Sequence, residues 1–525
     1  MHKAWNVLEI FEIIATFAGG GKLANVVSLA LTCHDFTEPS LNIIWHTLPD
    51  IAPLIMCMPS DLWETERIWV SFEYFTMIKF RRSLVESDWE RFDYYAPRVK
   101  ELGEHPEEYH QPRRMALHPN VYRDLVPRRH PARLLQQLRN LIWKWPYDGF
   151  APKDPNFCPR GEFITFALLF INPRLARLRI FYGDLRSNES LPPMTALLLQ
   201  LPISCPNLEI LRLHDLNPGQ GLSQPLSQSL MGLHSLRSLT ICTPLSDEAW
   251  FHLAGLPALE KVFANLQLVN GALPCIPLNP APFRALSQVD LTASLDPSLP
   301  LLKSLRESPI VHISIILPTP PTRRDICRFI DILTGSERWR NTLNIIDISP
   351  SPTNTAEAQG ALSPLQPLFV LKQVTVFRWD WPSFRPLNDG DLGELAQSWP
   401  KLRVLSMGYG EVDCTLQGAC ATLRGLVPLA RHCPKLYCLR IPLIVKASDT
   451  IGLQVVAKKS RDRRNLLISC EEWRFCDQSN QELRTVAKFL RVAFGDVKLT
   501  MQRRTRLSFE MTHRSRTVYE FLNKF

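Results

Sequence analysis

The sequence predicts an α/β repeat fold in three parts: a three-helix block at the N-terminus, an irregular solenoid of strand–helix repeats, and a C-terminal cap. Two observations lead to this prediction. The pattern L-x-x-L-x-L recurs eleven times at fairly even spacing, and apolar residues recur at helical steps near the N-terminus. The composition of the 525 residues is that of a folded protein, with 45% hydrophobic and 21% charged residues. The 43 prolines favour many short elements ended by stiff turns.

The first block contains three short amphipathic segments. Apolar residues in Val7–Phe17 recur at three- and four-residue steps with Glu9 and Glu12 between them, which predicts a helix. A second helix is predicted over Leu23–Cys33. Thr37-Glu38-Pro39 predicts the start of a third helix, with the proline in its first turn. Three short helices bury little area alone, so we expect this block to need a partner.

The order of residues within the block matches a known motif. The matching residues are Val7-Leu8-Glu9-Ile10, Ile13-Ile14, Leu29-Ala30-Leu31-Thr32-Cys33-His34-Asp35-Phe36 and Leu41-Asn42-Ile43-Ile44-Trp45. This block resembles the F-box, in the variant common in fungal F-box-like proteins. In that family the block docks on the Skp-type adaptor of a cullin–RING ubiquitin ligase. The resemblance implies an adaptor-binding surface lined or supported by Leu8, Ile10, Ile13, Val26, Val27, Leu29 and Trp45.

Two features of the block depart from the family pattern. Leu8-Glu9 stands where the family usually has Leu-Pro, and Gly19–Gly21 is an unusual turn between helices. These departures favour an alternative in which the repeats form a protein-binding scaffold without a ligase. An ordinary helical cap on the next domain is the other alternative, because short apolar helices are common.

The repeat pattern organises the rest of the chain. Its first positions are Leu138, Leu175, Leu208, Leu236, Leu259, Leu286, Ile310, Leu343, Leu371, Leu402 and Leu436, with a mean step of about 30 residues. This pattern resembles the leucine-rich repeat, in which each strand alternates and the following helix or loop covers one side. Cys205-Pro206-Asn207-Leu208 and Cys433-Pro434-Lys435-Leu436 resemble the Cys-containing repeat subtype of F-box proteins. Unrelated buried strands in an α/β sheet are the alternative.

The predicted domains follow these patterns. Residues 1–48 form the F-box-like helical domain, and residues 49–132 form bridging helices and a Pro/His/Arg-rich connection. Residues 133–445 form the solenoid, and residues 446–525 form a basic capping region. From Ile451 to Phe525 the chain has 16 Lys/Arg and 8 Asp/Glu, a net +8 of the total +9. The tract Lys458–Arg464 therefore predicts either an import signal, a patch for an acidic partner or simply a solvated face.

Motifs of catalysis are missing from the sequence. Gly19-Gly20-Gly21-Lys22 is followed by Leu23 rather than the Ser/Thr of a phosphate loop, and His105–His110 lacks the histidine spacing of a helical zinc site. We therefore assign no catalytic residue, cofactor or metal. The 13 cysteines, without C-x-x-C spacing or a secretion signal, predict a reducing compartment, cytoplasmic or nuclear. No apolar run reaches the ~18 residues that span a membrane.

Together, the two resemblances imply a non-catalytic substrate-recognition subunit of an SCF-type E3 ubiquitin ligase. Its expected partners are a Skp-type adaptor with its cullin complex, and a substrate protein of unknown identity. Nucleic acid is a third alternative that the basic tail raises, but few aromatic residues lie among its cations, so it is not the expected partner. Candidate substrate contacts are arginines that adjoin strand leucines: Arg179, Arg212, Arg237, Arg403 and Arg440.

Overall fold

A computed structural model describes most of the chain between residues 13 and 500. The described residues are 13, 15, 17, 23–70, 73–103, 115–126, 134–144, 158–181, 191–214, 220–266, 276, 281–350, 365–380, 387–407, 420–453, 466–469, 473–475, 479–495 and 497–500. The chain divides into two compact units, Met1–Leu259 and Glu260–Phe525, and each is described by itself.

The first unit combines a small mixed sheet with a run of parallel strands. Its helices are α2 (Leu23–Ala30), α3 (His34–Ile44), α4 (Ala52–Met56), α5 (Trp89–Tyr95), α6 (Pro119–Leu125), α7 (Arg160–Phe166), α8 (Leu191–Ser204), α9 (Ser223–Met231) and α10 (Asp247–Gly255). Its strands are β1 (Thr47–Leu48), β2 (Trp63–Val70), β3 (Glu73–Phe80), β4 (Glu101–Leu102), β5 (Met115–Leu117), β6 (Asn140–Lys144), β7 (Arg177–Phe181), β8 (Ile210–His214) and β9 (Ser238–Ile241).

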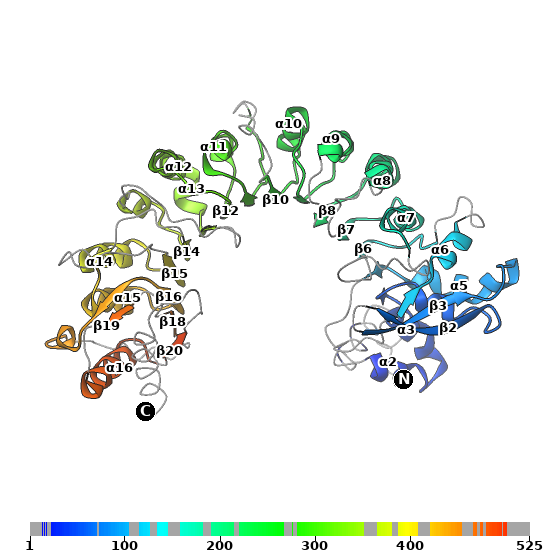
Figure 1. Cartoon of the computed structure of the whole chain (residues 1–525), viewed down its shortest axis with the longest axis horizontal. Helices are drawn as coiled ribbons and strands as arrows, with labels where there is room; N and C mark the ends of the chain where they lie inside the picture. The colour runs from blue at the N-terminus through cyan, green and yellow to red at the C-terminus, as the bar shows by residue number, and fades with distance from the viewer. Residues whose placement is uncertain are drawn as a thin grey trace. The chain divides into compact units, whose positions relative to one another are not determined.

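The parallel strands of the first unit follow one another in the order β1-β4-β6-β7-β8-β9. Helices α7, α8 and α9 lie on one side of β6, β7 and β8 (Figure 1). The alternate side chains on that side are buried, for example Leu178 and Ile180 of β7, each 0% exposed. The strand leucines and isoleucines thus pack under the helices. No helix of the described residues lies on the other face of these strands, which we call the helix-free face.

The second unit repeats this arrangement. Its strands are β10 (Lys261–Asn265), β11 (Gln288–Thr292), β12 (His312–Leu317), β13 (Ile345–Pro350), β14 (Val376–Trp379), β15 (Val404–Met407), β16 (Cys438–Arg440), β17 (Leu443–Val445), β18 (Leu466–Ser469), β19 (Trp473–Phe475) and β20 (Val497–Thr500). Its helices are α11 (Leu295–Ser304), α12 (Arg323–Gly335), α13 (Glu337–Thr342), α14 (Asp389–Ser398), α15 (Leu426–His432) and α16 (Asn480–Phe494). Parallel strands run in the order β10-β11-β12-β13-β14-β15-β16-β18-β20, and β17 pairs with β19.

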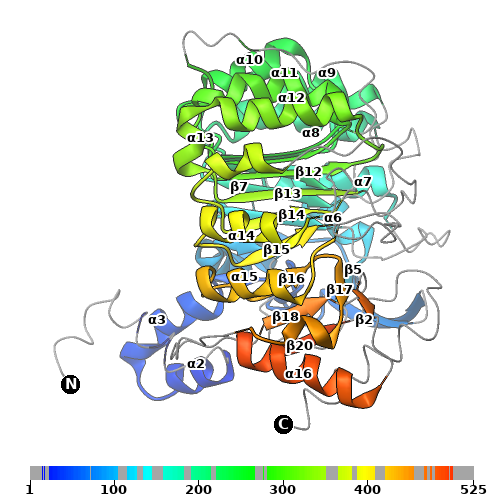
Figure 2. The same cartoon turned by 90° about the vertical axis from the view of Figure 1, so that its left-hand side faces the viewer.

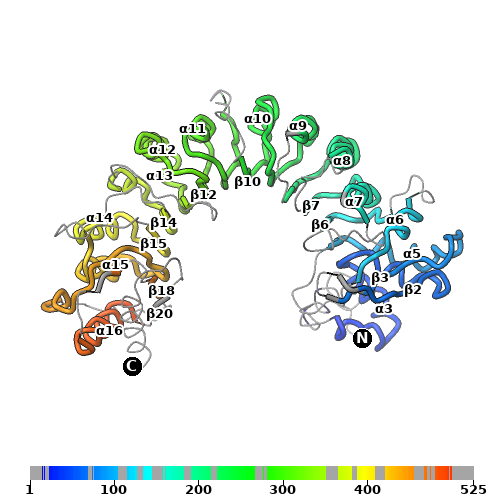
Figure 3. Tube along the Cα trace, viewed as in Figure 1, coloured from blue at the N-terminus to red at the C-terminus, as the bar shows by residue number. Residues whose placement is uncertain are grey.

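Successive strand–helix units of the second unit stack in chain order. Figure 2 shows α12, α14, α15 and α16 one after another beside the strands, and Figure 3 traces the chain from each strand to its helix and on to the next strand. Several of these helices begin at capping residues. Thr322 with Asp325 and Ser479 with Glu482 form reciprocal capping boxes at the starts of α12 and α16. Such stacking of similar units around a continuous core is consistent with a solenoid.

All eleven predicted pattern segments contain a strand, from β6 to β16. The second and third leucine-type positions are buried in ten of the eleven copies. In the copy predicted at Leu371-Val374-Val376 the assignment was wrong: Val376 is half-buried, and the register pairs Phe377 and Trp379, both buried, with Ile346 and Ile348 of the preceding strand. The prediction succeeds because a strand covered on one face needs an apolar residue at every second position.

Three parts of the structure differ from the prediction or lie beyond it. Helix α3 begins at His34, three residues before the predicted start, because Cys33 has the extended backbone of an N-cap; Pro39 therefore lies inside the helix. The segment predicted as bridging helices also contains a three-stranded sheet, β2-β3-β5, because β-branched and aromatic residues alternate along β2 and β3. The basic tract Lys458–Arg464 lies outside the described residues.

Buried polar side chains join the turns of successive repeats. The amide nitrogen of Asn172 donates hydrogen bonds to the backbone carbonyls of Leu135 (3.2 Å), Leu138 (3.1 Å) and Phe170 (3.3 Å), and its oxygen accepts from the N–H of Arg174 (2.8 Å). In the second unit, the thiol of Cys433 lies 3.5 Å from the carbonyl of Trp399. These side chains pair backbone groups that the strands leave unpaired at the turns.

Candidate protein-binding surfaces

The seven predicted adaptor-binding residues fall in different environments. Leu8 and Ile10 lie outside the described residues. Ile13 is 57% exposed and Val27 is 42% exposed, whereas Val26 is buried. Leu29 and Trp45 are half-buried.

Four large apolar side chains near the N-terminus are exposed, and we call them the apolar N-terminal surface: Ile13, Phe17, Val27 and Leu31. Phe17 and Leu31 are each 82% exposed. They form two pairs four residues apart, Ile13 with Phe17 and Val27 with Leu31; the N–H of Leu31 donates to the carbonyl of Val27 at 3.2 Å. Residues four apart lie on the same side of a helical turn, so each pair presents one apolar side. Phe17 and Leu31 were not among the predicted docking residues, although their four-residue spacing from Ile13 and Val27 was a signal for them.

Helix α3 is held on the first unit by contacts to α5 and the turn after it. The rings of Trp45 and Tyr95 stack with centroids 4.3 Å apart. Glu38 accepts hydrogen bonds from the hydroxyl of Tyr94 and from a terminal guanidinium nitrogen of Arg98. Trp45, the last residue of the F-box-like motif, therefore anchors the block rather than offering a free surface.

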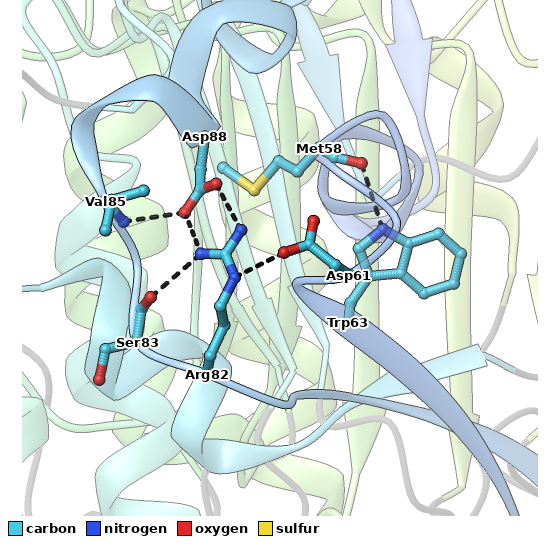
Figure 4. Close-up of polar contacts among 7 residues, drawn as sticks. All are labelled: Met58, Asp61, Trp63, Arg82, Ser83, Val85 and Asp88. Carbon is cyan, nitrogen blue, oxygen red and sulfur yellow. Dashed lines mark hydrogen bonds and ion pairs between the residues drawn. The ribbon is translucent and has the colours of Figure 1, made fainter.

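An ion-pair network in turn fixes the segment that leads into α5 (Figure 4). Arg82 donates to both carboxylate oxygens of Asp88, at 2.7 and 2.8 Å, and its Nε donates to Asp61 at 2.8 Å. Asp88 also accepts from the N–H of Val85 at 2.8 Å, and its side chain is only 2% exposed. Hydrogen bonds from Arg82 hold the pKa of Asp88 below its ordinary value although burial opposes them. The bidentate pair fixes the orientation of the segment that leads into α5, and α5 is the helix that α3 contacts.

The helix-free face of β6–β8 carries basic side chains. Register places Arg179 of β7 beside Arg212 of β8, with Ile142 of β6 on the other side of Arg179. Burial, and next the neighbouring charge of Arg179, lower the pKa of Arg212. At the far end of the same strands the rings of Phe181 and His214 stack at 4.5 Å.

The corresponding face of the second unit carries charges of both signs. Register aligns Asp290, Ser314, Asp347, Arg378, Ser406 and Arg440 in one row from β11 to β16. The charged residues of this row have partners within the row or next to it. Arg378 lies 3.3 Å from a carboxylate oxygen of Asp347, and Asp290 faces His312 at 3.6 Å. Arg440 lies 3.6 Å from Asp380, which also accepts from the hydroxyl of Ser406 at 2.7 Å.

The five predicted substrate-contact arginines do not form one group. Arg179 and Arg212 lie side by side on the face of the first unit. Arg440 lies on the face of the second unit, in an ion pair. Arg237 and Arg403 directly precede strands β9 and β15, so they lie at the edge where the strands begin rather than on either face. The guanidinium of Arg403 there sits 5.7 Å from the centre of the Tyr437 ring.

The described residues contain no metal-binding cluster, and several of their cysteines are buried. Across the described part of the chain, no group of three or more His, Cys, Asp or Glu side chains is placed to hold a metal ion. Burial raises the pKa of Cys433 to about 12 and also raises the pKa of Cys158, so these thiols stay protonated at neutral pH. Among the described helices, none has the length and apolar character needed to span a bilayer.

Comparison with known proteins gives distant structural likenesses alone. No family model matches the chain, and no curated protein matches it in sequence. A chain in the crystal structure of the yeast Rad7 and Elc1 complex is similar with a TM-score of 0.33 and 16% identity, over 63% of this chain and 77% of that chain. A chain in the Toll–Spatzle complex of Drosophila is similar with a TM-score of 0.32 and 11% identity, over 80% of this chain and 59% of that chain. Likenesses this distant carry no argument about the partners or function of this chain.

Proposed function

We propose that this chain is a non-catalytic substrate-recognition subunit of an SCF-type E3 ubiquitin ligase. In this proposal the N-terminal helices dock on a Skp-type adaptor, and the helix-free strand faces hold a substrate protein. The observation that carries the proposal is the exposure of Phe17 and Leu31, each 82%, within the block that resembles the F-box. Large apolar side chains exposed together on one block are typical of a surface that a partner covers.

The proposed mechanism is proximity rather than catalysis by this chain. A substrate held on the strand faces would be tethered to the adaptor, and so to the conjugating enzyme that carries ubiquitin. Tethering raises the effective concentration of the acceptor lysine, and it requires that the docking block keep a defined position. The contacts of Trp45 with Tyr95 and of Glu38 with Arg98 support such a position within the first unit.

The test is capture of a purified Skp-type adaptor by the full chain, compared with Ile13→Asp and Val27→Asp variants. A charge on the apolar N-terminal surface should weaken capture at least about tenfold, because moving a carboxylate from water into an apolar interface costs free energy. Ile203→Asp is the matched control, since Ile203 is 75% exposed on α8, away from the docking block. Equal loss in Ile13→Asp and Ile203→Asp would contradict docking through this surface.

A repeat scaffold without ligase association is the second candidate, and one sequence feature favours it. Glu9 stands where the F-box family usually has proline, in the segment that begins the motif. If the folded full chain does not capture the adaptor at all, this second candidate replaces the first. Circular dichroism of the same preparation establishes that the chain is folded.

A further inference from the structure

The helix-free face of β6–β8 differs from that of the second unit in the sign of its charges. We call it the cationic face, and it carries Lys144, Arg177, Arg179, Arg212 and His214. The strands β6 to β9 contain neither Asp nor Glu. By contrast, strands β11 and β13 of the second unit carry Asp290 and Asp347, and Asp347 pairs with Arg378. A positive partner is therefore disfavoured on the cationic face, and a negative one is attracted to it.

Two guanidinium groups form the centre of the cationic face. Arg179 and Arg212 are direct partners in the register of β7 and β8, and neighbouring strands lie about 4.8 Å apart. Both side chains are half-buried, so they are partly withdrawn from water. The Nε of Arg212 is buried, and no hydrogen-bond acceptor among the described residues reaches it. Two guanidinium groups side by side present several N–H donors to one anion and attract negative charge.

The surroundings of this pair fit a polypeptide better than a nucleic acid. Half-buried Ile142 and Ile210 lie beside the arginines and offer apolar contact to aliphatic side chains. Phe181 and His214, the aromatic residues of this face, stack on each other with their planes 8° apart, so each ring has one face covered. Single-stranded nucleic acid usually needs open aromatic faces on which its bases stack. A carboxylate, in turn, accepts the two parallel N–H bonds that the guanidinium fork presents.

From the charges, the register and these neighbours, we infer that the cationic face binds an acidic polypeptide segment, with carboxylate side chains seated over Arg179 and Arg212. This inference rests on the proposed role of the repeats in holding a partner protein, and it names the chemistry of that partner. It is independent of adaptor docking, which involves the other end of the first unit's sequence.

The test is fluorescence anisotropy with three labelled probes of equal length: a Glu/Ser peptide, a Gln/Ser peptide and a single-stranded oligothymidylate. The full chain should bind the Glu/Ser peptide at low salt, and affinity should fall as salt rises. The Arg179→Gln/Arg212→Gln double variant should weaken this binding by about tenfold or more, since two charge-assisted pairs are lost. Arg378→Gln and Arg440→Gln, the control variants on the second unit, should change it by less than about twofold, because these residues are not part of the cationic face.

Three outcomes would overturn the inference. Equal affinity for the Glu/Ser and Gln/Ser peptides would mean that charge is not recognised. Tighter binding of the oligothymidylate, lost in the same double variant, would mean that the face binds nucleic acid. Equal losses in the double variant and in the control variants would mean that the effect is general. Unfolding midpoints of all variants are measured alongside, and the adaptor capture assay on the double variant separates this inference from the proposed function.

Discussion

Asn172 offers a sharp test of how neighbouring repeats are held together. Its side chain is 1% exposed and hydrogen-bonds backbone groups of the preceding turn. The carbonyl of Leu135 also accepts from the N–H of Leu138 at 3.1 Å, so it keeps one hydrogen bond when Asn172 is replaced. Asn172→Ala would chiefly remove the partner of the Leu138 carbonyl and of the Arg174 N–H, and it would also remove the longer contact to the Phe170 carbonyl. A buried polar group without a partner costs about 1–3 kcal/mol, so we expect the free energy of unfolding to fall by about 2–4 kcal/mol.

The assay is denaturant unfolding of the full chain followed by tryptophan fluorescence and circular dichroism. Asn207→Ala is the matched control, because Asn207 follows the next helix, is exposed, and donates a single 3.5 Å hydrogen bond to the carbonyl of Pro173. It should change the free energy of unfolding by less than about 0.5 kcal/mol. Asn172→Asp keeps the shape of the side chain but turns a carboxylate oxygen toward carbonyl oxygens. The free energy of unfolding that this variant loses should therefore become smaller as the pH falls and the carboxylate is protonated. Equal costs for Asn172→Ala and Asn207→Ala would refute the reasoning.

Three further substitutions test the first unit. Trp45→Ala removes the stack on Tyr95 and should increase amide hydrogen exchange across α3 while leaving α8 unchanged; unchanged exchange in α3 would mean that the stack does not hold the helix. The pKa of Asp88 is held low by Arg82, so its contribution to stability exists above its ordinary pKa and disappears as the pH falls; the difference in unfolding free energy between wild type and Asp88→Asn should be largest near neutral pH and vanish in acid. Burial raises the pKa of Asp50 from 3.8 to about 6, so ionisation of Asp50 destabilises the folded state as the pH rises through this interval. Asp50→Asn should therefore gain stability relative to wild type over the same interval. A constant difference in unfolding free energy across it would contradict the assignment.

The strands were predictable because their signal is local and repeated. Leu211 and Leu213 of β8, like Leu239 and Ile241 of β9, are buried on the helix side of the sheet. Each pair is two residues apart, which is the spacing that a strand covered on one face requires. The sheet β2-β3-β5 was not predicted, because its aromatic residues also suit helices that pack between domains.

The candidate surfaces were predictable in part. Ile13 and Val27 were expected on the docking surface and are exposed, whereas Val26, expected on or behind the same surface, is buried. Neighbouring positions on a helix point in different directions, so apolar character alone does not tell which of two valines faces the solvent.

The sequence by itself determined which residues alternate, and therefore which segments become strands, because that choice depends on neighbours two positions away. It also determined the mixed charge of β11–β16 and the absence of acidic residues from β6–β9. Only the tertiary structure decided which of these residues meet. Arg179 and Arg212 are 33 positions apart and become neighbours through the register of β7 and β8, while Arg237 and Arg403, equally close to strand leucines in the sequence, remain at the strand edge. The register follows the repeat pattern, since Leu178 pairs with Leu211, but the two arginines become neighbours only when one repeat packs on the next.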